Sequence, residues 1–101
     1  MTKSLWHIST DYRADTAAER DAIRGEHLSF LLENKDTVHS VGARIDEEGH
    51  RVGGEYLLDV PDREAARAFI ERDPYSVNGH LAEVRISAFG AAILNHTSLI
   101  D

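Results

Sequence analysis

The sequence predicts a single α+β domain in the element order β-α-β-β-α-β. Its 101 residues are enough for one hydrophobic core, and no internal repeat or linker divides them. Short runs rich in β-branched and aromatic residues alternate with two stretches of helical periodicity. With 42% hydrophobic and 29% charged residues, the composition is that of an ordinary globular domain. We therefore expect residues 1–101 to fold as one unit.

Four strands are predicted from these apolar runs. They are residues 4–10, 38–45, 53–60 and 82–95. In the first strand, Trp6 and Ile8 fall on one face and Leu5 and His7 on the other. The second and third strands are joined by the polar turn DEEGHR, whose glycine suits a positive φ, so they form a hairpin. The last strand alternates until Gly90, where we expect a bulge or a bend.

Two helices are predicted from apolar residues at spacings of three and four. They cover residues 15–34 and 61–73. Asp15 or Thr16 can cap the first helix, and Asp62 can cap the second. The side of the first helix that should face the sheet carries Ile23, His27, Phe30, Leu31 and Asn34. Leu28 and Leu32 fall on the opposite side, so either this helix is covered twice or those leucines meet another surface.

This element order fits a ferredoxin-like sheet with both helices on one face. The other face is then uncovered, and we expect it to carry apolar residues such as Leu57, or the pair Trp6 and Ile8. A monomer rarely exposes a large apolar patch. We therefore expect a homodimer in which two sheets pack face to face.

Charge and composition exclude several classes of partner. The formal net charge of −7 argues against nucleic acid, because nucleic-acid binders gather Lys and Arg on one face. No apolar run approaches the roughly 20 residues that span a bilayer, and the first residues lack the apolar core of a signal peptide. We expect no membrane partner and a cytoplasmic location. The absence of cysteine excludes disulfides, thiolate nucleophiles and Cys-ligated zinc.

An aspartate stands where the second predicted helix ends, in ERDPYSVNGHL. The carbonyls at a helix end repel a carboxylate, and Pro74 alone explains why the helix stops. Asp73 follows Phe69 by four residues and Ala66 by seven, so its side chain should point toward the sheet if the helix persists that far. Asp73 is therefore either a solvated loop residue or half of a chemical site.

A histidine lies on the inward side of the first helix. His27 is either a core residue whose ring nitrogens are satisfied internally or a functional group. Arg20 and Arg24 border it on the helix surface, which gives it a cationic edge. Those arginines alternatively belong to a solvated face, paired with Glu19 and Asp21.

The other histidines are His7, His39, His50, His80 and His96. None shows the spacing of a metal motif, so we expect neither a metal nor another cofactor. His50 is expected on the surface of the turn. His7 and His39 lie in strands that could be neighbours, which leaves a metal or haem ligand lining a barrel as an alternative.

Two sequence elements resemble those of the YciI-like, or YCII-related, family. The segment RGEHLSFL (Arg24–Leu31) matches the pattern R-x-x-H-x-x-[FY]-L, and DPYSVNGHL contains the family's D-P-[FY] element. The resemblance implies a dimeric ferredoxin-like α+β barrel with an active site made by a histidine and an aspartate. These map onto His27 and Asp73, while Arg24 matches the family's arginine and Tyr75 its aromatic residue.

The chain departs from the family pattern at His80, between Gly79 and Leu81, and at Phe89, where many members have a Pro-Trp-like pair. These departures affect the expected pocket walls and leave the histidine and the aspartate in place.

No serine or cysteine nucleophile motif and no phosphate-binding glycine loop accompanies the histidine. Proton transfer is thus favoured over acyl or phosphoryl transfer. We expect lyase or isomerase chemistry on a small carboxylic acid or lactone, with Arg24 binding a substrate carboxylate. The alternative is a dimeric module that binds a small, anionic molecule without converting it.

Overall fold

The computed structural model describes residues 4–100 and has the predicted α+β order, with a few short additions. The main strands are β1 (Ser4–Tyr12), β2 (Val38–Ile45), β3 (Arg51–Leu58) and β4 (Leu81–Gly90). The helices are α1 (Ala17–Glu33), α2 (Arg63–Arg72) and the single turn α3 (Pro74–Val77). Near the C-terminus, a small hairpin adds β5 (Ile93–Leu94) and β6 (Thr97–Ser98).

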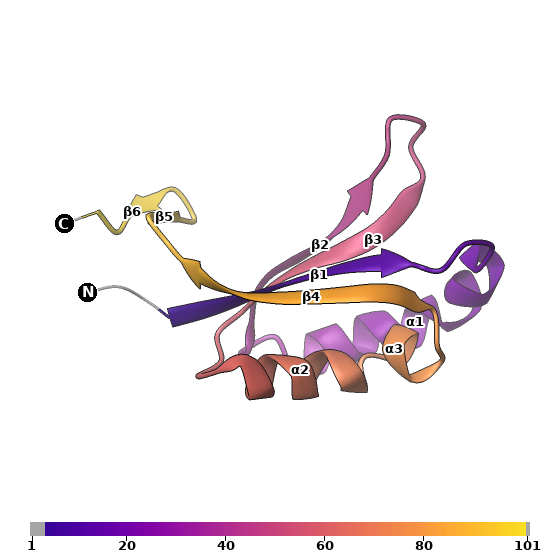
Figure 1. Cartoon of the computed structure of the whole chain (residues 1–101), viewed down its shortest axis with the longest axis horizontal. Coiled ribbons are helices and arrows are strands. Elements are labelled where there is room, and N and C mark those ends of the chain that lie inside the picture. Colours follow the sequence, from indigo (N-terminus) through magenta and orange to yellow (C-terminus); the bar gives the residue numbers. More distant parts are fainter. Residues whose placement is uncertain (1–3, 101) are drawn as a thin grey trace.

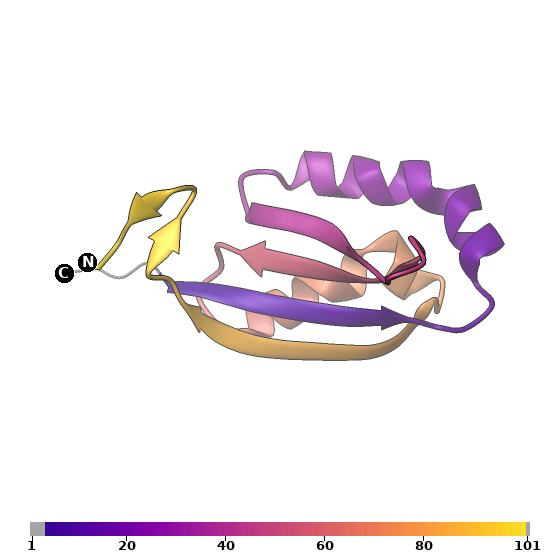
Figure 2. The ribbon, with the colours of Figure 1, turned by 90° about the horizontal axis from the view of Figure 1, so that it is seen from above.

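The four main strands form one antiparallel sheet in the order β2-β3-β1-β4. Figure 1 shows all three helices on one side of this sheet, and Figure 2 shows that α1 runs along its β2 edge. The ferredoxin-like fold predicted from the element order is confirmed.

The core lies between the sheet and α2. Its buried members are Ile8, Tyr56, Leu58, Ala66, Phe69, Ile70 and Ile86. Trp6 packs against this cluster, so the face of β1 that carries Trp6 and Ile8 is turned toward the helices. The expectation that this pair lies on the uncovered face is therefore wrong. Leu57 does lie on that face, because strand residues alternate and its neighbours Tyr56 and Leu58 point into the core.

A charged network occupies much of the uncovered face. Arg44 donates to Glu55 at 2.6 Å and also to the Asp11 carboxylate. Arg85 donates to Asp11 at 3.0 Å from the other side. Gly53 gives this network room, because a Cβ there would collide with the Thr10 carbonyl oxygen and lie 2.7 Å from the Arg44 guanidinium. This face is thus more polar than the sequence led us to expect.

The predicted N-cap is confirmed for α2 but not for α1. Asp62 caps α2, and its carboxylate accepts from the Ala65 amide at 2.8 Å, as predicted. Thr16 occupies the N-cap position of α1, but its hydroxyl donates to the Arg13 carbonyl at 2.7 Å and caps nothing. Asp15 precedes it with a φ of 61°. The chain thus enters α1 through a tight turn instead of a side-chain cap.

The last strand is shorter than predicted. It ends at Gly90 instead of continuing to residue 95, and the chain turns back at Asn95 and His96, which both have positive φ. Figure 1 shows the resulting β5–β6 hairpin beyond the end of the main sheet. The expected bend at Gly90 is therefore the end of the strand.

The outer side of α1 is open. Leu32 is 69% exposed, so no second layer covers this side within residues 4–100, whereas Leu28, which is 38% exposed, lines a cavity between α1 and the sheet. None of the helices in this part of the chain is long and apolar enough to cross a membrane.

Candidate active site

Asp73 lies between two helices and is completely buried. The regular part of α2 ends at Arg72, and Asp73 has an extended conformation with φ −63° and ψ 130°. Pro74 starts α3, for which its fixed φ is suited. The Asp73 carboxylate caps this new turn by accepting from the Tyr75 amide at 2.9 Å. The unfavourable carbonyl end of α2 is thus opposed by the amide end of α3.

The same carboxylate accepts from two side chains that lie far away in the sequence. His27 Nδ1 of α1 lies 2.8 Å from Oδ1, and the Tyr56 hydroxyl of β3 donates to Oδ2 at 2.7 Å. In its carboxylate form Asp73 has no proton to donate, so both of its oxygens act as acceptors. His27 Nδ1 therefore donates its proton to Asp73, which leaves Nε2 as the free ring nitrogen.

Tyr56 remains a donor throughout the ordinary pH range. Burial raises the pKa of its hydroxyl, and the adjacent negative charge of Asp73 raises it further. Its hydroxyl consequently fixes the second carboxylate oxygen.

The His27 ring is held flat against an aromatic neighbour. It stacks on the Tyr75 ring at a centroid distance of 4.0 Å and an interplanar angle of 8°. Among residues 4–100, every buried side-chain nitrogen or oxygen has a hydrogen-bond partner. Within the same residues no hydrogen bond reaches Nε2 of His27, so this nitrogen is not buried and is accessible from the cavity that His27 lines. The ring thus combines a fixed orientation with an open basic nitrogen.

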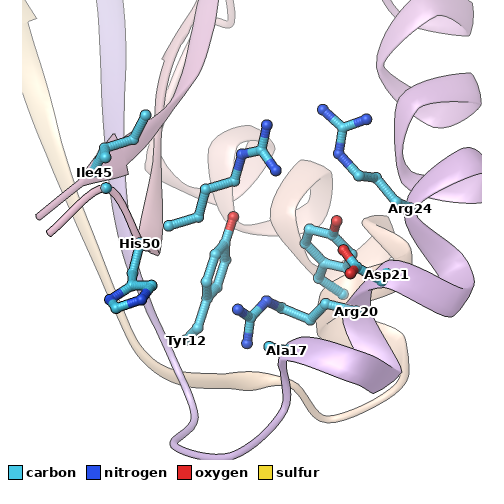
Figure 3. A pocket seen from close by; sticks show the side chains of 10 residues that line it. Tyr12, Ala17, Arg20, Asp21, Arg24, Ile45 and His50 are labelled. Atoms are coloured by element: carbon cyan, nitrogen blue, oxygen red, sulfur yellow. The ribbon is translucent and has the colours of Figure 1, made fainter.

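Two neighbouring hollows lie between α1 and the sheet. The inner cavity, about 170 Å³, is lined by His27, Leu28 and Leu31 of α1 and by Val41, Ala43 and Gly54 of the sheet. The outer hollow, about 440 Å³, is lined by Arg20 and Asp21 of α1 and by Ile45 and His50 near the hairpin turn (Figure 3). The residues that line both are Tyr12, Arg24, Arg51 and Tyr75. A ligand at His27 therefore has a route into the outer hollow.

The tyrosines on this shared wall are neutral in the ordinary pH range. Burial raises the pKa of Tyr12 and that of Tyr75. The two rings meet edge to face at 5.7 Å, and the Arg20 guanidinium lies over the Tyr12 ring at 4.1 Å. The wall is thus aromatic, with cationic groups at its margin.

The arginines of α1 are not paired as a solvated face would require. Arg20 donates to the Thr16 hydroxyl, and within residues 4–100 neither Arg20 nor Arg24 forms an ion pair with Glu19 or Asp21. Figure 3 shows the side chains of Arg20 and Arg24 reaching from α1 toward the hollow. The expected pairing with Glu19 and Asp21 is therefore wrong, although Arg24 itself is exposed to solvent.

The structure brings together all four residues singled out from the sequence. His27 and Asp73 form a direct hydrogen bond, while Arg24 and Tyr75 line both hollows. Sequence reasoning missed Tyr56 as a partner of Asp73. The alternation of β3 put Tyr56 on the same face as Leu58, and a buried tyrosine hydroxyl needs a partner, so this signal was present.

Of the remaining histidines, His50 lines the outer hollow, whereas His7 and His39 line neither of the two hollows. His7 and His39 are not on adjacent strands, because β3 separates β1 from β2. His7 instead lies 2.7 Å from Glu55, and His39 contacts the Ser40 hydroxyl. His50 lies 3.6 Å from Asp46 in the exposed turn. Within residues 4–100, no cluster of three His, Asp or Glu side chains is arranged to hold a metal ion.

Solved structures with the same fold include one enzyme with a bound small molecule. It is 5-chloro-2-hydroxyhydroquinone dehydrochlorinase (TftG) from Burkholderia phenoliruptrix, in complex with 2,5-dihydroxybenzoquinone. The likeness has a TM-score of 0.75 at 19% identity and covers 84% of this chain and 92% of that one.

Two further solved structures are more distant. A dimeric ferredoxin-like protein from an uncultured marine organism has a TM-score of 0.52 at 16% identity and covers 92% of this chain and 98% of that one. An antibiotic biosynthesis monooxygenase has a TM-score of 0.51 at 13% identity and covers 86% and 97%. At these identities the likenesses establish the fold.

A search of curated proteins gives no match. The family model of the YCII-related domain, in contrast, matches residues 5–90, which span the sheet, all three helices and the His27–Asp73 pair. The chain belongs to the YCII-related domain family.

Proposed function

We propose that this protein catalyses proton transfer, as a lyase or isomerase, on a small carboxylic acid or lactone. The observation that carries the proposal is the buried Asp73 carboxylate, which holds His27 by Nδ1 and leaves Nε2 accessible from a cavity. A histidine held in this way is suited to general acid–base catalysis near neutral pH.

In the proposed reaction, Nε2 of His27 removes a proton from a carbon beside a carbonyl group. The ring then becomes an imidazolium, which the negative charge of Asp73 stabilises. The proton returns to another carbon in an isomerisation, or a leaving group departs in an elimination. Arg24 binds the substrate carboxylate, since a guanidinium can donate two parallel hydrogen bonds to it. Tyr75 lines the cavity and keeps the His27 ring in its plane.

The fold neighbour TftG supports this class of chemistry. Its name describes the loss of hydrogen chloride, a reaction in which a proton and a leaving group depart from the substrate. TftG is also in complex with a small ring compound, 2,5-dihydroxybenzoquinone. These are properties of TftG, and by analogy they favour elimination or isomerisation over acyl transfer for the present chain.

We also propose that the protein is a homodimer formed by the uncovered face of the sheet. An apolar hollow of about 260 Å³ lies on this face, and Leu57 and Phe89 contribute to its wall. One of the fold neighbours is described as a dimeric ferredoxin-like protein. Light scattering at low micromolar concentration should give the mass of two chains, and a folded monomer would contradict the dimer.

The test of the proposed chemistry is proton exchange in D₂O. Small acids and lactones are incubated with the protein, and ¹H NMR follows the loss of protons on carbons next to a carbonyl group. Exchange should require His27, so it should disappear in His27→Gln and persist in His7→Gln, which changes a histidine on the opposite face of the sheet. Ligands that bind without any His27-dependent exchange or turnover would support the alternative, a non-catalytic binding module.

A further inference from the structure

The outer hollow gathers positive charge in a protein that is acidic as a whole. The chain has 18 acidic residues against 11 Lys and Arg. Yet Arg20, Arg24 and Arg51 all line this hollow, and Asp21 is the carboxylate among its lining residues. Acidic ligands are therefore attracted to this place against the overall charge of the molecule.

These three guanidinium groups also lack carboxylate partners. Within residues 4–100, none of Arg20, Arg24 and Arg51 forms an ion pair, whereas Arg44 and Arg85 on the opposite face both do. Arg20 has the Thr16 hydroxyl and the Tyr12 ring as its contacts. The donors that suit a bidentate anion thus remain available in the hollow.

The sizes of the two spaces indicate a ligand that extends through both. An apolar cavity of about 150 Å³ holds a single benzene ring, so the inner cavity of about 170 Å³ suits one ring or a short acid. Sites for small molecules usually measure about 300–1,000 Å³, a range that includes the outer hollow of about 440 Å³. Because four residues line both spaces, a ligand seated beside His27 can reach the outer arginines.

We infer that the substrate carries two anionic groups and that Arg20 and Arg51 bind the second one in the outer hollow. This inference rests on the proposed function, in which the reacting end lies beside His27 and a first carboxylate is bound by Arg24. Arg51 and Arg20 approach from opposite sides, since Arg51 belongs to β3 and Arg20 to α1. They therefore determine specificity for a dianion without taking part in proton transfer.

The test compares two ligands that differ by one carboxylate. Terephthalate carries two carboxylates on a ring, and 4-methylbenzoate replaces one of them with a methyl group of similar reach. Calorimetric titration at low salt should show terephthalate binding about 10-fold more tightly, because a guanidinium–carboxylate contact is charge-assisted. The preference should weaken as salt is added, since the hollow is open to solvent.

Variants assign this preference to the proposed residues. Arg51→Gln and Arg20→Gln should each reduce the preference to within about 3-fold, because each removes one of the two cationic partners. Arg67→Gln is the matched control, since Arg67 is exposed on α2 and lines neither hollow. Asp21→Asn should act in the opposite direction and increase the preference, because it removes a negative charge from the hollow. Circular dichroism verifies the fold of each variant.

Three results would overturn the inference. They are equal affinity for the two ligands, no binding of terephthalate at millimolar concentration, and a preference that survives in the Arg20→Gln/Arg51→Gln double variant. If Arg51→Gln does not fold, two other variants test the inference. Arg51→Lys should lower the preference for terephthalate, and Asp21→Asn should raise it.

All these variants keep His27 and Asp73, so the proposed chemistry is judged separately by exchange in D₂O. A preference for dianions without proton exchange would support the dianion-binding site and contradict the proposed catalysis.

Discussion

Two histidine–carboxylate pairs lie on opposite faces of the same sheet. In the helix-covered pair, His27 Nδ1 and Asp73 Oδ1 are 2.8 Å apart, and in the uncovered pair, His7 Nε2 and Glu55 Oε1 are 2.7 Å apart. The distances are nearly equal, but the side chains are 11% and 0% exposed in the first pair and 34% and 37% exposed in the second. A short contact therefore does not distinguish a reactive pair from a surface pair.

The carboxylates of Glu55 and Asp73 differ in the charge of their hydrogen-bond partners. Burial raises the pKa of Glu55, but hydrogen bonds from Ser9, Arg44 and His7 outweigh it and hold the pKa below its usual value. Arg44 thus compensates the charge of Glu55 whether or not His7 is protonated. The other donors to Asp73 are neutral, namely an amide and a tyrosine hydroxyl, so in the described part of the chain His27 is its one basic hydrogen-bond partner. Its charge is available to stabilise an imidazolium formed during a reaction.

The largest expected difference between the pairs is in turnover. His27→Gln should lower kcat by about 10²–10⁴-fold, which is the usual contribution of a general acid–base. His7→Gln should leave kcat within about 3-fold, because His7 lines neither of the two hollows beside His27. Steady-state kinetics on a substrate found by the exchange screen measures both. Equal losses in the two variants would refute the distinction between the pairs.

The next difference concerns the carboxylates and the free energy of unfolding. Asp73→Asn should destabilise the protein by about 2–3 kcal/mol, because an amide nitrogen would face a donor in a fully buried position. Glu55→Gln should cost less than about 1 kcal/mol, as is usual for partly exposed ion pairs. Denaturant unfolding measures both values. ¹⁵N NMR of the imidazole should also show the Nδ1–H form of His27 in the native protein and a mixture of tautomers in Asp73→Asn.

A smaller contrast comes from the hydroxyl groups that support each carboxylate. The Tyr56 hydroxyl donates to Asp73 and the Ser9 hydroxyl to Glu55, both at 2.7 Å. Tyr56→Phe should cost about 1 kcal/mol of unfolding free energy, since a buried acceptor loses its donor. Ser9→Ala should cost within about 0.5 kcal/mol, because water can replace the hydroxyl at a half-exposed carboxylate. If the two variants lost the same unfolding free energy, burial would not explain the difference between the two carboxylate networks.

Much of the fold could be predicted from the sequence because periodicity reports burial directly. The alternation of Trp6 and Ile8 against Leu5 and His7 assigned the two faces of β1, although it did not say which face the helices cover. The short helix α3 and the β5–β6 hairpin were not predicted. The helix α3 has four residues, and β5 and β6 have two residues each, so none is long enough to show a pattern of apolar residues.

The candidate site was less accessible to sequence reasoning. His27 and Asp73 are 46 residues apart, so the residues alone left both as either structural or functional, and the pairing came from the family resemblance. The spacing from Phe69 correctly predicted that the Asp73 side chain points inward. The reason differs from the predicted one, because α2 ends at Arg72 and Asp73 points inward as the N-cap of α3. Arg51 falls in the polar turn DEEGHR in the sequence pattern. In the structure it is the first residue of β3 and lines the outer hollow, and no local sequence signal indicates this position.

The smallest expected effect is confined to acidic pH and to the uncovered face. Hydrogen bonds from Arg85 and then Arg44 lower the pKa of Asp11 to about 2. The unfolded chain has an aspartate pKa of about 3.9, so it binds more protons than the native state between these values. The stability that Asp11 contributes is therefore present above about pH 4 and is lost as the pH falls toward about 2.

Asp11→Asn should accordingly flatten the dependence of Tm on pH between about 4 and about 2, with little change in turnover at neutral pH. Thermal melts across this range measure the slope, and Asp36→Asn, which changes an exposed aspartate outside the network, is the control. The same slope in Asp11→Asn as in the native protein would show that the network on the uncovered face does not determine acid stability. Because Asp11 is open to solvent, salt should reduce its contribution, whereas the hydrogen bond between His27 and Asp73, which are buried, should respond little to ionic strength.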